Sequence, residues 1–324
     1  SQSQSTASEG VILRESSGQF EIVAAGSGGG VSIIAKGGAN DDAVIQLNDP
    51  VYVLAKDGDV EIKAESSNEF GRLYSDSGGS LTLGYTAAEN THYDVTSSSS
   101  NIRITSSGSI YKEGLLTAKT DGGNFTIASD LGSNDSGTIN LRGGLDVSTN
   151  GGNITLGGGD LLASGYALGE STSTLTEGVR IDKKLNLNSS NGDIIIRGSS
   201  SDVSLSTYGY GNSGFGVYGL TSAGQMNSGT GTIQIEGLNL NPSYTDYSSG
   251  VIFALNGGNL ITITSANTTA NAINILGYAT GPNTENYGIE VEASSPLSIE
   301  ATGDGGGITV KTSQKTTATN KYDL

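Results

Sequence analysis

The stretch GVRIDKKLNLNSSNGDIIIRG, from Gly178 to Gly198, decides the fold, because a glycine opens it and aliphatic residues then alternate with polar ones. Its first phrase is Gly178-Val-Arg-Ile181, and similar phrases begin at Gly216, Gly250 and Gly288, at nearly equal intervals. Its second phrase is Asp193-Ile-Ile-Ile196, and similar phrases begin at Thr232, Ala272 and Gly307. Long repeats of this kind indicate stacked units that share one core.

Alternation at period two is typical of half-buried strands, and the chain has only 4 Pro and no helical stripe of useful length. The sequence therefore predicts an all-β fold: a right-handed parallel β-helix (β-solenoid), elongated, with loops protruding along one edge. Inward aliphatic residues of successive coils should stack as ladders. The pattern leaves open whether each repeat, such as the one from Gly178 to Gly216, is one coil or two.

We expect a single β-solenoid domain over residues 1–324, because a repeat protein grows by adding coils. Closely spaced strips predict a tightly coiled N-terminal part at 1–95, and a Ser- and Thr-rich stretch predicts irregular structure at 96–120. Long-period repeats follow at 121–312, where the spacing from Ile154 to Ile194 matches the later period. The alternation is lost in the tail at 313–324, which we expect to pack loosely or to cap the last coil.

The net charge of −17, with only 16 dispersed Lys and Arg, argues against a nucleic-acid partner. No apolar run reaches membrane-spanning length, so we expect no membrane insertion. The absence of Cys excludes disulfides and thiolate metal sites, and no His cluster or phosphate loop occurs, so we expect no metal or cofactor. The chain begins at Ser1, which suggests a processed product or an excised segment.

The stretch quoted above and GIEVEASSPLSIEATGDGGGITVKTS, from Gly288 to Ser313, resemble the degenerate repeats of filamentous-haemagglutinin-like exoproteins. These are large surface adhesins that Gram-negative bacteria export by two-partner secretion. The family's N-terminal secretion module usually carries Asn-Pro-Asn, whereas the one Asn-Pro here, Asn241-Pro242, continues into Ser243. The resemblance, which covers 121–312, implies an adhesive shaft or receptor-contacting segment at the bacterial cell surface or in the extracellular space.

Tyrosines gather in the second half, where 8 of the 14 fall between residues 166 and 287. Most precede a repeat glycine, so their rings should line one edge of the solenoid. An aromatic strip of this kind suits stacking on sugars or contact with a protein, although the rings could simply pack the loops onto the shaft. The predicted ligand-binding residues are Tyr166, Tyr208, Tyr210, Tyr244, Tyr247 and Tyr287, with Tyr278 in the same strip.

Asn-x-Ser/Thr triplets occur five times. Some adhesins of the family that the chain resembles are glycosylated at such triplets, so the resemblance makes modification a candidate here. Triplets also arise by chance in a chain this rich in Asn, Ser and Thr. The candidate glycosylation sites are Asn124, Asn134, Asn153, Asn188 and Asn267.

Carboxylate pairs on one strand face are the candidates for catalysis, because residues i and i+2 point to the same side. They are Glu290 with Glu292 and Glu61 with Asp59, and the one histidine is His92. Solvated charge on the outer face is the better explanation of these residues, so we expect no enzyme activity.

The predicted function is a structural and adhesive shaft that binds glycans or proteins of a host or a neighbouring cell through a loop edge. One alternative is a filament subunit that self-associates end to end through exposed β-edges. The other is a polysaccharide-degrading β-helix enzyme.

Overall fold

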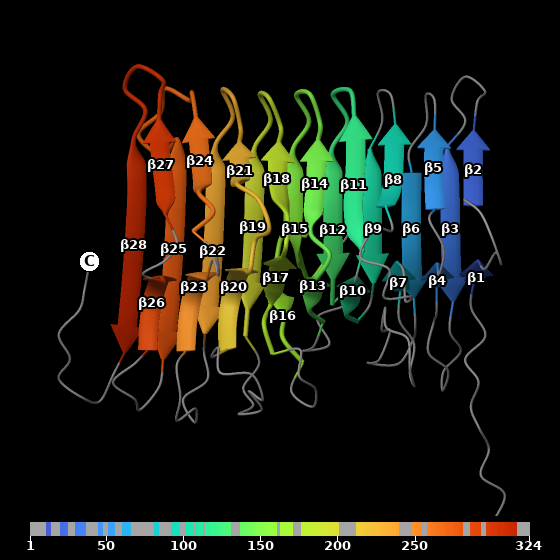
Figure 1. Cartoon of the computed structure of the whole chain (residues 1–324), viewed down its shortest axis with the longest axis horizontal. Coiled ribbons are helices and arrows are strands. Elements are labelled where there is room, and N and C mark those ends of the chain that lie inside the picture. Colours follow the sequence, from blue (N-terminus) through green and yellow to red (C-terminus); the bar gives the residue numbers. More distant parts are fainter. Residues whose placement is uncertain are drawn as a thin grey trace, which may run out of the picture.

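The computed structural model is a parallel β-solenoid whose strands stack along one long axis (Figure 1). It describes residues 11–13, 20–24, 30–36, 45–47, 51–55, 60–65, 81–83, 92–97, 101–106, 108–112, 114–130, 137–160, 163–170, 176–200, 212–239, 248–254, 258–280, 286–292 and 296–315. These residues contain strands and turns but no helix. The predicted parallel β-solenoid class is therefore confirmed.

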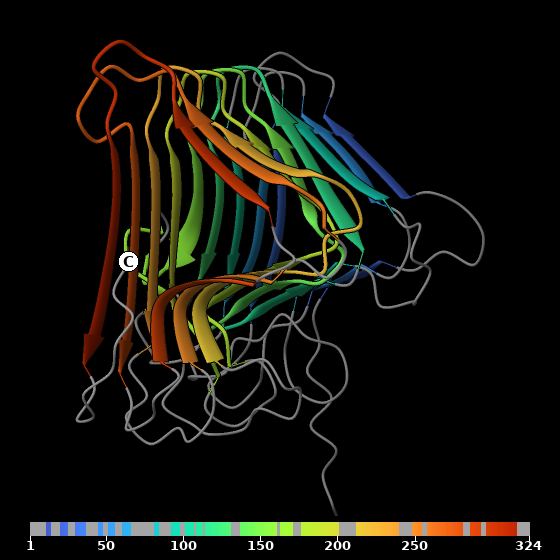
Figure 2. The same cartoon turned by 60° about the vertical axis from the view of Figure 1, so that its left-hand side comes forward.

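Three parallel sheets, which we name A, B and C, form the sides of the solenoid (Figure 2). Sheet A consists of two blocks, β1 (Val11–Leu13), β4 (Ile45–Leu47) and β7 (Leu81–Leu83), then β10 (Ile110–Lys112), β13 (Ile139–Leu141), β17 (Val179–Asp182), β20 (Asn212–Tyr218), β23 (Ser248–Ala254) and β26 (Asn286–Val291). Sheet B consists of β2 (Phe20–Ala24), β5 (Val51–Ala55), β8 (His92–Ser97), β11 (Leu115–Thr120), β14 (Leu145–Ser148), β18 (Leu185–Asn188), β21 (Gly224–Asn227), β24 (Ile261–Ser265) and β27 (Leu297–Ala301). Sheet C consists of β3 (Val31–Lys36), β6 (Val60–Glu65), β9 (Ile102–Ser106), β12 (Phe125–Ser129), β15 (Ile154–Gly158), β19 (Ile194–Ser199), β22 (Ile233–Asn239), β25 (Ile273–Thr280) and β28 (Ile308–Lys315), and β16 (Ala167–Leu168) also pairs with β19.

Each repeat is one coil, because each adds one strand to every sheet in the order A, B, C. In sheet C, Ile194 pairs with Ile233 and Ile233 with Ile273. The second repeated phrase of the sequence therefore begins at equivalent positions in successive coils, and the question of one coil or two is answered in favour of one.

The first repeated phrase has a different register from the one that the sequence suggests. Val179 pairs with Phe215, and Phe215 pairs with Val251, so Gly214 is the equivalent of Gly178 and Gly250. The assignment of Gly216 to this position was wrong by two residues. Two glycines near each other, Gly214 and Gly216, both precede an aliphatic strip, and the sequence pattern alone did not distinguish them.

The equivalent glycines of sheet A cross directly over glycines at the ends of sheet C strands. A Cβ at Gly237 would lie 1.9 Å from the carbonyl oxygen of Gly250, and one at Gly277 would lie 1.9 Å from that of Gly288. Contacts this short leave no space for a side chain. The crossing explains the glycine that follows the second phrase in three coils, Gly198, Gly237 and Gly277, whereas the last coil has Thr312 at this position.

Coil length varies along the chain in a way that differs from the sequence prediction. In sheet C, Val31 pairs with Val60 and Val60 pairs with Ile102, so the second of these two coils is the longer. The shortest coil runs from Ile102 to its partner Phe125. Strands β9, β10 and β11 thus occupy the stretch 96–120 for which irregular structure was predicted, because its short strips such as Ile102–Ser106 still alternate. At the other end, β28 runs through Lys315, three residues into the predicted tail.

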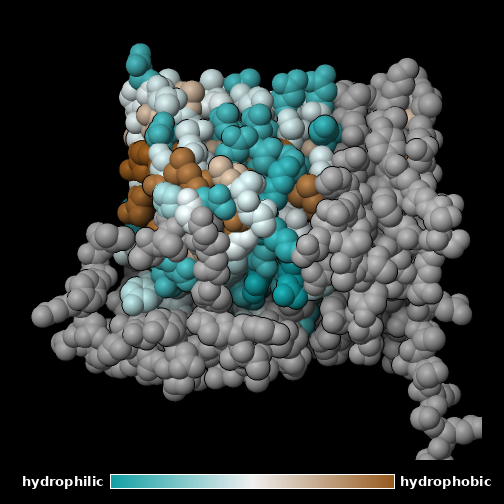
Figure 3. Space-filling model, viewed as in Figure 1, coloured by the Kyte–Doolittle hydropathy of each residue, from teal (hydrophilic) through white to brown (hydrophobic). Residues whose placement is uncertain are grey.

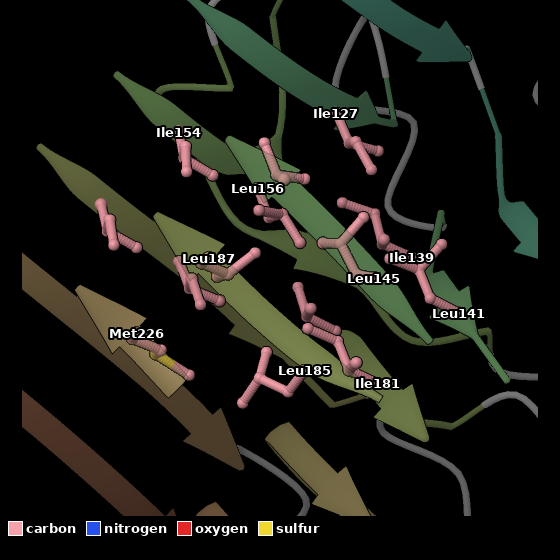
Figure 4. Packing of buried hydrophobic residues seen from close by; sticks show 14 of the residues in the cluster. Ile127, Ile139, Leu141, Leu145, Ile154, Leu156, Ile181, Leu185, Leu187 and Met226 are labelled. Atoms are coloured by element: carbon pink, nitrogen blue, oxygen red, sulfur yellow. The ribbon is translucent and has the colours of Figure 1, made fainter. Parts of the chain in front are cut away.

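Aliphatic ladders fill the interior, as the alternation predicts (Figure 4). Ile154, Ile194, Ile233 and Ile273 form one ladder in sheet C, and all are fully buried. In sheet B, Leu145, Leu185, Gly224 and Ile261 occupy equivalent positions. Burial of an aliphatic side chain contributes about 1.5–3 kcal/mol, so these ladders are the main source of stability.

The corner between sheets B and C is built from hydroxyls and glycines. The side chains of Thr149, Ser189 and Ser228 each donate to the carbonyl oxygen of the glycine three residues later, and these hydroxyls are buried. The second corner residue has positive φ, 48° at Asn150 and 62° at Ser190. The glycines Gly123, Gly152, Gly192 and Gly231 then stack in a column along the axis.

A side-chain ladder runs beside this glycine column. The main-chain N–H of Asn153 donates to Asn124 Oδ1 at 2.8 Å, and that of Asp193 donates to Asn153 Oδ1 at 2.8 Å. The N–H of Thr232 continues the series to Asp193 Oδ1 at 2.7 Å. Each coil therefore supplies an acceptor for the next, which fixes the register at this corner.

Lys112 is an exception among the described interior residues. It pairs with Leu141, which pairs with Ile181, so it stands at an aliphatic ladder position of sheet A. Its side chain is fully buried, and its ammonium donates to the carbonyl oxygen of Gly114. Desolvation by burial holds the pKa of Lys112 well below its usual value.

We expect Lys112 to make stability depend on pH. Because its folded-state pKa is lowered, the unfolded chain binds more protons between that pKa and about 10.4, so stability increases as pH rises through this window. Melting temperatures of wild type and Lys112→Met, measured by circular dichroism from pH 6 to 10, should differ most in favour of the variant at the acidic end. Parallel curves would contradict this expectation.

Candidate binding surface

Tyr166, one of the predicted site residues, follows a turn at the end of β15. After β15 the chain turns back, and the carboxylate of Asp160 accepts the main-chain N–H of Ser164 at 3.1 Å. An antiparallel bridge between Gly158 and Gly165 closes this turn. The chain then runs as β16 along β19, which places Tyr166 beside the outer face of sheet C.

The phenol of Tyr166 reaches across to the outer face of β22. Its hydroxyl donates to Glu236 Oε2 at 2.6 Å, and Arg197 Nε lies 3.7 Å from the same oxygen. Gln234 Nε2 donates to Glu236 Oε1 at 2.6 Å, and Arg197 donates to Gln234 Oε1 at 3.2 Å. Four side chains from three segments thus form one hydrogen-bonded group, which we name the Tyr166 cluster.

The electrostatics hold Tyr166 in its neutral, donating form. Burial, the hydrogen bond to Glu236 and the charge of Glu236 raise the pKa of Tyr166 to about 12, against a smaller lowering by Arg197. At neutral pH the cluster therefore presents a phenol, a carboxylate, a guanidinium and an amide side by side. These groups together can donate and accept hydrogen bonds to a ligand that carries hydroxyls or amides.

Apolar side chains adjoin the Tyr166 cluster on the same face of sheet C. Leu238 and Tyr278 are paired across β22 and β25, and Leu276 is paired with Glu236. All three are half-buried on the outer side. Mixed aromatic, aliphatic and charged side chains on one exposed face are typical of binding surfaces.

The outer face of sheet B has a different character. From β14 to β24 its outward residues are all polar, and Figure 3 shows mainly hydrophilic residues in the upper middle of the view. Asn186 Nδ2 donates to Asp146 Oδ1 and Gln225 Nε2 to Asn186 Oδ1, both at 2.6 Å. Because these groups bond along the ladder and expose no aromatic ring, sheet B is the weaker candidate surface.

The other predicted tyrosines are distributed over two sheets or lie outside the described residues. Tyr278 faces outward on sheet C, as does Tyr166, whereas Tyr287 lies in β26 of sheet A, paired with Ser249. Tyr208, Tyr210, Tyr244 and Tyr247 lie outside the residues that the structure describes. A continuous aromatic strip thus stays a prediction, with Tyr166 and Tyr278 on one face.

Four of the five glycosylation candidates are described, and their side chains serve the fold. Asn124 and Asn153 are exposed and belong to the corner ladder through Oδ1. Asn188 Oδ1 accepts the N–H of Ser190, and Asn267 Nδ2 donates to the carbonyl of Thr230 at 2.7 Å. Asn134 lies outside the described residues. Glycosylation stays a prediction.

The described carboxylates among the catalytic candidates lie on β6 and at β26. Ser249 donates to Glu290 Oε2, and Glu292 follows the end of β26, where burial raises its pKa. Glu61 is on the outer side of β6 and accepts from Ser32 at 3.4 Å. Asp59 lies outside the described residues, and only the backbone of His92 is described, at the start of β8. Within the described ranges no three His, Cys, Asp or Glu residues are grouped to hold a metal ion.

Sequence reasoning missed a largely buried ion cluster on the outer face of sheet A. Arg180 donates to Glu177 Oε1 at 2.9 Å and to both oxygens of Asp182 at 2.9–3.2 Å. Its guanidinium lies 4.6 Å from the ring centroid of Tyr218, whose hydroxyl is 2.9 Å from Ser213 Oγ. The sequence signal was the close spacing of opposite charges at Glu177, Arg180 and Asp182, the last two of which lie on β17.

Burial dominates the electrostatics of this ion cluster. Desolvation raises the pKa of both Glu177 and Asp182 against the opposing effect of Arg180. Burial, with the charge of Glu177, also raises the pKa of Tyr218. Since its two carboxylates are only 6% and 14% exposed, we interpret the cluster as structural.

Comparisons with protein-family models, with curated proteins and with solved structures found no match for the chain. Among the described residues no helix is long and apolar enough to cross a bilayer.

Proposed function

We propose that the chain is a structural and adhesive shaft of a secreted or bacterial cell-surface protein, and that it binds a glycan or a protein through the outer face of sheet C. The stacked coils hold a contact surface at a fixed place on a long body. Weak contacts repeated along such a body add by multivalency. No covalent chemistry is part of the proposal.

The Tyr166 cluster is the observation that carries this proposal. Tyr166 is fixed at its hydroxyl by Glu236 and flanked by Arg197, with Leu238 and Tyr278 beside it. A ring that is fixed before binding loses little conformational entropy when a ligand stacks on it. The surface location is supported by the resemblance of 178–198 and 288–313 to adhesin repeats.

Binding should depend on Tyr166. A screen of the chain against neutral and acidic glycans and host surface proteins comes first, and the strongest binder then serves as the probe for Tyr166→Ala. Truncation of a tyrosine at the centre of an interface costs about 2 kcal/mol or more, so affinity should fall about 30-fold.

Asn186→Ala, on the polar face of sheet B, is the matched control and should bind as the wild type does. Equal affinity of Tyr166→Ala and wild type, with both folded by circular dichroism, would remove this surface from consideration.

A further inference from the structure

In the last described coil, side chains at the inward ladder positions are partly exposed, whereas those of the preceding coil are buried. Ile308 and Val310 of β28 pair with Ile273 and Ile275 of β25. Ile273 and Ile275 are 0% and 1% exposed, whereas Ile308 and Val310 are 45% and 44% exposed. The same ladder thus changes from fully buried to half-exposed within one coil.

The other two sheets show the same change. Val291 of β26 is 41% exposed, whereas its partner Phe253 is 0% exposed. Leu297 of β27 is only partly buried, and its partner Ile261 is fully buried. Figure 3 shows hydrophobic residues gathered at this C-terminal end of the solenoid. An apolar patch of this kind at the end of a shaft is typical of an interaction surface.

Strand edges surround the patch. Among the described strands, β26, β27 and β28 each pair on one side alone, with β23, β24 and β25. Strand β28 is one of the two longest, with 8 residues, and its pairing with β25 uses all of them. An edge strand with free N–H and C=O groups and apolar side chains on one face favours pairing with another chain.

At the opposite end of sheet C the described inner-face residues are covered, although the terminal strand β3 also pairs on one side alone, with β6. Val31 and Ile33 of β3, the first strand of this sheet, are only 7% and 8% exposed. A second copy therefore finds no equivalent apolar opening at the N-terminal end of sheet C. The C-terminal coil of the second copy does offer an exposed apolar face.

We propose that the C-terminal coil binds the same coil of a second copy, so that two chains join tail to tail. A two-fold axis normal to sheet C reverses both the strand direction and the solenoid axis. It keeps the inner face of the sheet on the same side. Antiparallel pairing of β28 with β28 of the second copy then extends sheet C across both chains.

This arrangement matches like surfaces. Ile308 and Val310 of both copies lie on the shared inner face, while Thr309 and Lys311 lie on the outer face, since residues alternate along a strand. The contact is isologous and closes at two copies, in contrast to a head-to-tail contact, which grows into fibres.

Sedimentation equilibrium over a wide concentration range tests the proposal. The wild-type chain should shift from monomer to dimer and stop there. Ile308→Glu with Val310→Glu places charges in the apolar contact and should weaken dimerisation about 30-fold or more. The control Thr309→Glu places one glutamate on the outer side of the same strand, between the two test positions, and should dimerise as the wild type does.

Cross-linking tests the orientation, because the chain has no cysteine of its own. A Lys311→Cys variant should form a covalent dimer with a short bismaleimide, whereas Ser32→Cys, on the first coil, should not. A wild type that stays monomeric, fibres that lengthen with concentration, or a dimer that survives the double glutamate change would each overturn the proposal.

Discussion

Replacing Arg180 by methionine should lower the free energy of unfolding by about 3–5 kcal/mol, because removal of one partner leaves the others buried and uncompensated. Arg180 forms ion pairs with both Glu177 and Asp182, whose side chains are only 6% and 14% exposed. Methionine keeps the volume of the stem but supplies no charge. Urea denaturation followed by circular dichroism measures the loss.

The size of this loss should depend on pH. Because burial raises the pKa of Glu177 and Asp182, the folded variant binds protons more tightly than the unfolded chain does. Stability of the variant should therefore be highest at acidic pH and fall as pH rises through the raised pKa values. The deficit relative to wild type is expected to be smaller at pH 4 than at pH 7.

Lys184→Met is the control for Arg180→Met. Lys184 Nζ lies 2.6 Å from Asp146 Oδ2, but its side chain is 39% exposed, and exposed ion pairs contribute about 0–1 kcal/mol. If the two variants lost similar stability, burial would not be the reason for the effect at Arg180.

The second large effect is expected in the aliphatic ladder, where Ile273→Ala should lower the free energy of unfolding by about 2–5 kcal/mol. Its side chain is fully buried between β22 and β28, so truncation leaves a cavity that neighbouring coils cannot fill without moving. The chain supplies its own control in Ile308, the same residue type at the same ladder position one coil later. Ile308→Ala should cost well under half as much in a dilute, monomeric sample.

Equal costs at Ile273 and Ile308 would show that the last coil is as well packed as the interior. At protein concentrations that favour the proposed dimer, the cost at Ile308 should increase, while the cost at Ile273 should stay the same.

Most of the fold could be predicted from the sequence because one physical signal, alternation at a repeated spacing, carries it. The spacing predicts that Ile154 and Ile194 are equivalent, and the two residues do pair in the observed register. Gly216 was misassigned because glycine positions are set by the crossing of sheets A and C, and this contact lies between segments that are distant in sequence. The same holds for Lys112, whose ladder position no local pattern reveals.

The candidate site was less predictable. Tyr166 was chosen from its place before a repeat, but its partner Glu236 is 70 residues away and only the stacking of coils joins them. The ion cluster of Arg180 escaped notice because outward strand residues are expected to face water, whereas Tyr218, Ile252 and Ala254 on the outer side of sheet A are buried. The pattern of a strand predicts which side a residue takes, but not what covers that side.

The glycine column at the corner of sheets B and C bears on the mechanics of the molecule. A Cβ at Gly152 would lie 2.0 Å from Gly123 O, and one at Gly192 would lie 2.2 Å from Gly152 O. Main chain therefore touches main chain from coil to coil, with no deformable side chain between them. A compressive load along the solenoid axis is carried directly by this column. When the solenoid bends, the corner between sheets B and C should therefore shorten less than the other sides.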